Sequence, residues 1–176
     1  MDASKDKKIY SFDAGALILL EVFYPARLFP KVWERLDILI SEKRLYVLDK
    51  VYDEVTKKDD TVSAWLKARR IELKKRFSDK QMEKVFEIIR TFPKLIDYNN
   101  KNEQADPYLV ADAISSGSVI VTTEKNPNLP LQAKRKKESI ATVCDHYSVT
   151  YINNNAVHQN HYAMRLFDEL GLTQLG

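Results

Sequence analysis

The chain has 176 residues and a formal net charge of +3, and 44% of its residues are hydrophobic and 30% charged. This length predicts a single domain over 1–176, and only four glycines and six prolines exclude collagen-like and low-complexity classes. The single Cys144 excludes a disulfide framework and multi-cysteine metal sites, which is typical of the cytoplasm. Because Asp13, Glu21 and Pro25 interrupt the first apolar stretch, we expect neither a signal peptide nor a membrane-spanning helix.

Hydrophobic spacing predicts strands that alternate with helices. Short apolar runs with polar flanks are typical of buried strands, and apolar residues three and four positions apart are typical of helices. The expected strands are 9–12, 45–49, 118–122 and 149–152. The expected helices are 14–23, 30–40, a short one around 51–57, two within 61–92, and then 106–116, 140–147 and 153–170.

Several boundaries have clear chemical signals. Ser78 or Asp79 can cap the second helix of 61–92, which predicts a helical hairpin there. Asp106 is expected at a helix N-cap, with Pro107 in the first helical position and Gly117 as the stop. Strands separated by helices predict a three-layer α/β/α sandwich with a mostly parallel central sheet.

Charge is unevenly distributed. Residues 65–90 contain nine Lys or Arg against four acids, and residues 125–138 contain five against one. Residues 97–124 contain five acids and one Lys. A basic surround beside an acidic segment is typical of a metal-dependent enzyme that acts on a polyanion, although each run alone is as readily a solvated surface.

Four acids are expected near one edge of the sheet. Asp13 and Glu124 follow strands, Asp106 begins a helix, and Glu54 lies in the helix after the second strand. In an open parallel sheet, ligands bind beyond the carboxyl ends of the strands. Carboxylates gathered there would repel one another unless protonated or bound to hard cations such as Mg²⁺ or Mn²⁺. The sequence therefore favours metal-assisted phosphodiester hydrolysis.

Four segments carry a resemblance to a known family. They are IYSFDAGALI, LDKVYDEV, DPYLVADAISSG and VIVTTEKN. In this order and approximate spacing they resemble the PIN-domain family of Mg²⁺- or Mn²⁺-dependent nucleases, many of which are ribonuclease toxins of toxin–antitoxin pairs. The resemblance runs from about residue 8 to residue 155, and the segment KKESIATVCDHYSVTYIN is similar to a less-studied branch of that family.

The resemblance implies a PIN-like endoribonuclease that hydrolyses RNA with one or two Mg²⁺ or Mn²⁺ ions. Asp13 and Asp106 would bind the metal, and Glu54 and Glu124 would complete the site directly or through water. If the protein is a toxin, an antitoxin protein would cover the acids, and such domains are often homodimers.

Supporting residues are expected around these acids. The resemblance implies that Thr122 or Thr123 hydrogen-bonds a ligand carboxylate. Candidate contacts to RNA phosphates, which are as readily a solvated loop, are Lys134, Arg135, Lys136 and Lys137. The family usually has Ser, Thr or Asn two positions after the first acid, where this chain has Gly15. Its fourth acid is more often Asp than Glu.

Some alternatives stay open. Asp53 lies about 100° around the helix from Glu54, and spacing does not decide which of them points inward. Asp112 is turned about 120° from Asp106 and is left out of the site. His158 and His161 are expected on an exposed helix face. Two other functions remain: a non-catalytic nucleic-acid-binding PIN-like module, and a Mg²⁺-binding receiver-type signalling domain.

Overall fold

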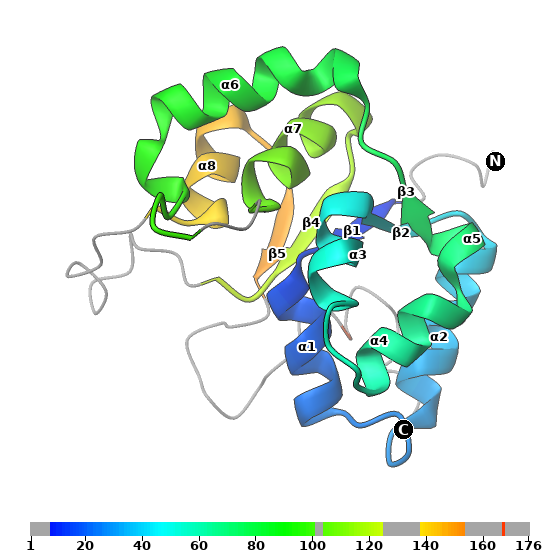
Figure 1. Ribbon diagram of the computed structural model, residues 1–176. Coiled ribbons are helices and arrows are strands. Elements are labelled where there is room, and N and C mark those ends of the chain that lie inside the picture. The colour runs from blue at the N-terminus through cyan, green and yellow to red at the C-terminus, as the bar shows by residue number, and fades with distance from the viewer. Residues whose placement is uncertain (1–7, 101–103, 125–137, 154–166, 168–176) are drawn as a thin grey trace, which may run out of the picture.

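Five short strands form one parallel sheet at the centre of the molecule (Figure 1). The computed structural model describes residues 8–100, 104–124, 138–153 and 167. The strands are β1 (Tyr10–Phe12), β2 (Leu45–Leu48), β3 (Lys74–Lys75), β4 (Val119–Thr122) and β5 (Tyr151–Asn153). They lie in the order β3-β2-β1-β4-β5, so β1 is the middle strand.

Helices flank the sheet in two groups, which confirms the expected three-layer α/β/α sandwich. The first group is α1 (Ala14–Phe23), α2 (Pro30–Ser41), α3 (Asp49–Val55), α4 (Thr61–Ala68) and α5 (Arg70–Leu73). The second is α6 (Met82–Thr91), α7 (Asp106–Ser116) and α8 (Ile140–Tyr147), with short 3₁₀ turns η1 (Asp79–Gln81) and η2 (Pro93–Leu95) beside α6. In Figure 1 the second group lies together at the upper left, and the first lies at the lower right.

Local chemistry explains where the helices that matter for the site begin and end. Asp13 caps α1 by accepting the backbone N–H of Ala16. Pro30 occupies the first turn of α2, where its missing N–H costs nothing. Gly117 ends α7 with φ of 70°, a left-handed conformation that glycine adopts without steric cost. These three boundaries agree with the sequence prediction.

The core lies on both faces of the two middle strands. Every residue of β1 and β4 is buried, as expected for parallel strands covered by helices on each side. Trp33 of α2 packs edge-on against Trp65 of α4, with ring centroids 5.1 Å apart. In the described part of the chain, no helix is both long and apolar enough to cross a membrane.

The segment 61–92 is more divided than the predicted helical hairpin. Ser78 caps the second half, as expected, in a reciprocal pair of hydrogen bonds with Gln81. Lys74–Lys75, however, leave the helical path and pair with β2 at the edge of the sheet. As a result α4 packs in the first helical group and α6 packs against α7 in the second. The predicted last helix at 153–170 falls almost entirely outside the described residues.

Candidate active site

The carboxyl ends of β1 and β4 meet at one edge of the sheet. Asp13 directly follows β1, and its backbone N–H donates to the carbonyl of Val121 in β4 at 3.0 Å. Glu124 stands two residues beyond the last residue of β4. Parallel pairing of these neighbouring strands therefore brings two of the predicted site residues to the same place.

Asp13 is a carboxylate held in an enclosed position, with only 5% of its surface exposed. Its Oδ1 accepts the Ala16 N–H, and its Oδ2 accepts the hydroxyl of Thr122 at 2.5 Å. Burial raises the pKa of Asp13 to about 6, against lowering by these hydrogen bonds, and the negative charge of Glu124 raises it further. Asp13 is therefore a carboxyl group poised to change its protonation near neutral pH.

Glu124 is half-buried and bridges to the next helix. Its Oε2 accepts the backbone N–H of Ile140, the first residue of α8, at 2.6 Å. Its own N–H donates to Oγ1 of Thr122 at 3.1 Å. The side chain, one methylene longer than Asp, thus spans from the end of β4 to a helix N-terminus, where negative charge is stabilised.

The structure gives a reason for the unusual Gly15. A Cβ at this position would lie 2.7 Å from Oγ1 of Thr123, closer than packed atoms approach. The hydroxyl of Thr123 therefore stands where a side chain at position 15 would go. Thr123 also supplies a backbone hydrogen bond that lowers the pKa of Asp13. In this chain a threonine after β4 fills the space beside the first acid.

Asp106 begins α7, one residue away from the predicted position. The N-cap is Ala105, and Asp106 is the first helical residue, so the predicted N-cap is wrong by one. The reason is that Ala105 already has near-helical angles, φ −76° and ψ −20°, and Pro107 fits the first turn in either register. Because α7 runs about 16 Å back from the start of β4, it returns Asp106 toward the carboxyl edge of the sheet.

Glu54 and Asp53 are both solvent-exposed on α3. The buried face of this helix is formed by Val51, Tyr52 and Val55, so neither acid points into the core. Asp53 is engaged with Lys74 of β3, whose Nζ lies 2.6 Å from its Oδ1.

The acids suit a hard cation in their chemistry more than in their present spacing. Asp13 and Glu124 offer only oxygen donors, and a divalent cation would relieve the repulsion that raises the pKa of Asp13. Within the described residues, however, no three His, Cys, Asp or Glu side chains are grouped so that they could hold a metal. The pair Asp13–Glu124 is thus the part of the predicted site that the structure brings together.

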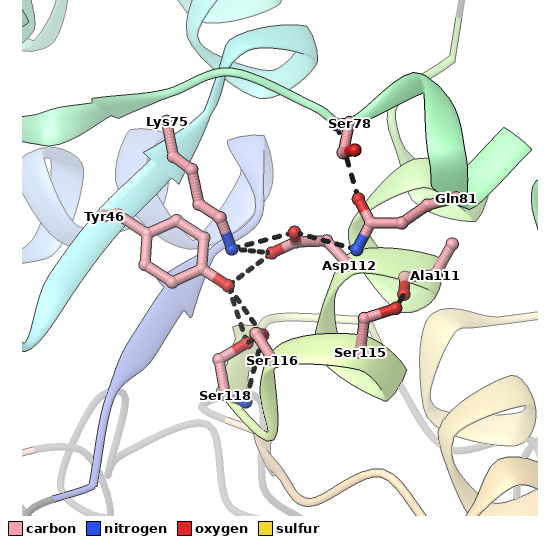
Figure 2. Close-up of polar contacts among 9 residues, drawn as sticks. All are labelled: Tyr46, Lys75, Ser78, Gln81, Ala111, Asp112, Ser115, Ser116 and Ser118. Atoms are coloured by element: carbon pink, nitrogen blue, oxygen red, sulfur yellow. Dashed lines mark hydrogen bonds and ion pairs between the residues drawn. The ribbon is translucent and has the colours of Figure 1, made fainter.

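Sequence reasoning missed a second polar cluster, built around Asp112 of α7. This carboxylate is 1% exposed and lies between three side chains (Figure 2). Nζ of Lys75 is 2.8 Å from it, the hydroxyl of Tyr46 donates to it at 2.5 Å, and Nε2 of Gln81 lies 3.4 Å away. A charged residue on the buried stripe of a helix was the available signal.

The Asp112 cluster ties the sheet edge to α7. Burial, together with the hydrogen bond to Asp112, raises the pKa of Tyr46, so its hydroxyl stays protonated and donates. The same hydroxyl is 2.8 Å from Oγ of Ser118 and 3.2 Å from Oγ of Ser116, at the end of α7. Strands β2 and β3 are thereby joined to both the middle and the end of the helix that begins with Asp106.

Other candidates have simpler positions. Cys144 is fully buried, and burial, with the charges of Asp145 and Glu124, raises the pKa of its thiol to about 12. It is therefore an inert packing residue at neutral pH. The candidate phosphate contacts at 134–137 and both histidines of the last helix lie outside the described residues.

The comparisons with known proteins add a family. Residues 10–163 match the family model described as "Domain of unknown function (DUF4411)". The chain belongs to this family. A search of curated proteins gives no match.

Two solved structures are similar to the chain. VapBC2 from Rickettsia felis, crystallised with a DNA fragment from its promoter, is 17% identical with a TM-score of 0.46 over 68% of this chain and 90% of that one. PAE2754 from Pyrobaculum aerophilum is 21% identical with a TM-score of 0.42 over 80% and 96%. At these values the likeness carries over nothing that either protein binds. The resemblance of this DUF4411 chain to PIN domains rests on its four sequence segments and on the sheet edge where Asp13 and Glu124 meet.

Proposed function

We propose that this DUF4411 chain is a metal-dependent nuclease, and more narrowly an endoribonuclease that hydrolyses RNA phosphodiester bonds. The observation that supports it most is the buried Asp13 at the end of the middle strand, beside Glu124 and held by Thr122. Structural carboxylates are seldom enclosed next to a second acid, because both burial and repulsion oppose their charge. Such a pair is an arrangement that a divalent cation stabilises.

In this proposal Asp13 and Asp106 hold Mg²⁺ or Mn²⁺, with Glu124 and Glu54 completing the site directly or through water. When bound, the ion would supply activation of the attacking water and charge stabilisation on the phosphate. The chain's own contribution is positioning. Thr122 fixes the orientation of the Asp13 carboxylate, and the hydrogen bond from Ile140 fixes Glu124.

The wider assignment follows the resemblance to PIN domains. It includes RNA as substrate, a cytoplasmic location, an antitoxin protein that covers the acids, and a homodimer. A receiver-type domain is disfavoured, because α4, α5, β3 and α6 all lie between β2 and α7, and such an insertion has no counterpart in that fold. The non-catalytic binding module remains the other candidate.

The test is cleavage of labelled single-stranded RNA, and of DNA with the same sequence, by the purified full chain in Mn²⁺, Mg²⁺ or EDTA. We expect Mn²⁺-dependent RNA cleavage by the wild type and none by Asp13→Asn. Asp59→Asn, which removes an exposed acid between α3 and α4, is the matched control and should cleave like the wild type. Equal cleavage by Asp13→Asn would contradict the site, and a folded wild type that binds RNA without cleaving it would establish the non-catalytic module.

A further inference from the structure

An open, basic hollow lies on the outer edge of the sheet, beside the candidate active site. Its volume is about 400 Å³, and it is lined by Asp49, Arg70, Ile71, Lys74 and Arg76. Three of these five residues are cations and one is a carboxylate. The exposed Ile71 adds an apolar wall, since 92% of its surface faces solvent.

Strand register places this hollow at the same edge of the sheet as Asp13. Val47 pairs with Lys74 and Leu48 with Lys75, so the next pair in register is Asp49 with Arg76. On the other side of β2, Ser11 pairs with Tyr46, which puts Asp13 level with Leu48. With neighbouring strands about 4.8 Å apart, Arg76 stands roughly 10 Å across the edge from Asp13.

The two arginines supply the available positive charge. Both side chains belong to exposed residues, and neither forms an ion pair with any residue the structure describes. Lys74 is partly neutralised by Asp53, and Oδ1 of Asp49 accepts the backbone N–H of Lys50 at 2.9 Å. A guanidinium group binds phosphate through two parallel N–H donors, so an unpaired pair of arginines in a hollow favours a phosphate-bearing ligand.

An aromatic side chain lies between the hollow and the acids. Nζ of Lys50, the residue after Asp49, sits 5.0 Å from the centre of the Tyr108 ring. Tyr108 is two residues after Asp106 on α7, and Phe77 holds its ring edge-on at 5.1 Å. Single-stranded nucleic-acid sites combine cations along the backbone with aromatic rings against the bases.

We propose that this hollow binds backbone phosphates of a single-stranded RNA whose reacting phosphate lies at Asp13. The inference rests on the proposed nuclease function and names where the substrate strand runs: from Asp13, past Lys50 and Tyr108, to Arg70 and Arg76. A flexible single strand can follow this edge and turn a base toward Tyr108. A duplex keeps its bases stacked inside and cannot make that contact.

The experiment measures binding of a fluorescein-labelled oligouridine of about 12 nucleotides, in EDTA, over a series of KCl concentrations. The variant is Arg70→Ser/Arg76→Ser. Its matched control is Arg27→Ser/Lys31→Ser, which removes the same charge from exposed residues where α1 leads into α2, at the far end of α1 from Asp13. Two lost phosphate contacts should lower the slope of log K against log salt by about 1.4, since each contact on a single strand contributes about 0.7. The control should keep the wild-type slope.

Three results would overturn the inference. They are equal slopes in all three proteins, an equal loss in the control, and no binding of oligouridine by the wild type. Displacement by polyglutamate as effective as by unlabelled oligouridine would also overturn it, because the hollow would then suit an acidic protein. Cleavage in Mn²⁺, measured separately, distinguishes the two proposals. A wild type that cleaves RNA while the arginine variant keeps its slope refutes only the hollow, and a lost slope without any cleavage refutes only the nuclease.

Discussion

The hydroxyl of Thr122 donates to the carboxylate of Asp13 across the ends of two neighbouring strands, with Oγ1 and Oδ2 2.5 Å apart. This bond stabilises the charged form of Asp13, while burial and Glu124 oppose that charge. Burial prevails, and the pKa of Asp13 rises from 3.8 to about 6. A carboxylate so placed lowers the stability of the metal-free protein, and this cost can be measured.

We expect metal-free stability to depend on pH through Asp13. Because its pKa is higher in the folded than in the unfolded state, the folded protein holds more protons between about pH 4 and 6. Its free energy of unfolding should therefore fall as pH rises through this range, relative to Asp13→Asn, by about 2–3 kcal/mol at most. Asn keeps the N-cap of α1. Urea unfolding of both proteins in EDTA from pH 4 to 8 gives the difference.

Thr122→Val provides the control for this measurement. Without the donated hydrogen bond, the pKa of Asp13 should be higher still, and the fall in stability should extend to higher pH. Parallel pH curves for the wild type and Asp13→Asn would show that Asp13 has an ordinary pKa.

Gly15→Ala should destabilise the protein. The new Cβ would meet Oγ1 of Thr123 at 2.7 Å, and relieving such crowding in a packed region costs about 1–3 kcal/mol. Gly15→Ala/Thr123→Ala should recover most of this loss, because the second change removes the clashing hydroxyl. A double-mutant cycle from urea unfolding tests it. Strictly additive effects would mean that the two positions do not share this space.

Asp112→Ala should lower stability but leave cleavage intact in the folded protein. It removes the acceptor of Lys75 and Tyr46, and breaking a fully buried ion pair typically costs about 3–5 kcal/mol. We expect about 2 kcal/mol here, because the side chain of Lys75 is 36% exposed and its charge can be solvated. Urea unfolding and RNA cleavage at 25 °C measure the two effects. Loss of cleavage without loss of stability would make Asp112 part of the active site.

The sequence predicted most elements because their signals are local. A proline in the first turn places α2, and Gly117 with its positive φ ends α7. It did not predict β3, because a two-residue strand of lysines has no apolar pattern and depends on pairing with β2. Such an edge strand is fixed by tertiary contacts.

The candidate site shows the same division. Asp13 and Glu124 follow neighbouring parallel strands, so topology alone predicts that they meet. Asp112 was set aside because only its rotation from Asp106 was considered. Its partner Tyr46 is 66 residues away in sequence, and that spacing contains no sign of the contact. The role of Thr123 beside Gly15 was equally hidden, because it depends on the distance between two chain segments.

The role of Asp106 can be tested without a substrate, by melting the wild type and Asp106→Asn, each in EDTA and in Mn²⁺. Asp106 is the first residue of α7 and not its N-cap, so Asn should cost only its favourable charge at the helix N-terminus, about 0.3–1 kcal/mol.

Mn²⁺ at about 100 times its dissociation constant adds about 2.7 kcal/mol to a protein that binds it only when folded. For a chain of this size that is roughly 5–10 °C in Tm. The wild type should show this shift, and Asp106→Asn should show much less of it. Asp59→Asn, which leaves all four predicted ligands in place, should shift like the wild type. An equal Mn²⁺ shift in wild type and Asp106→Asn would mean that Asp106 is not a ligand, and that the acids at the strand ends bind the ion without it.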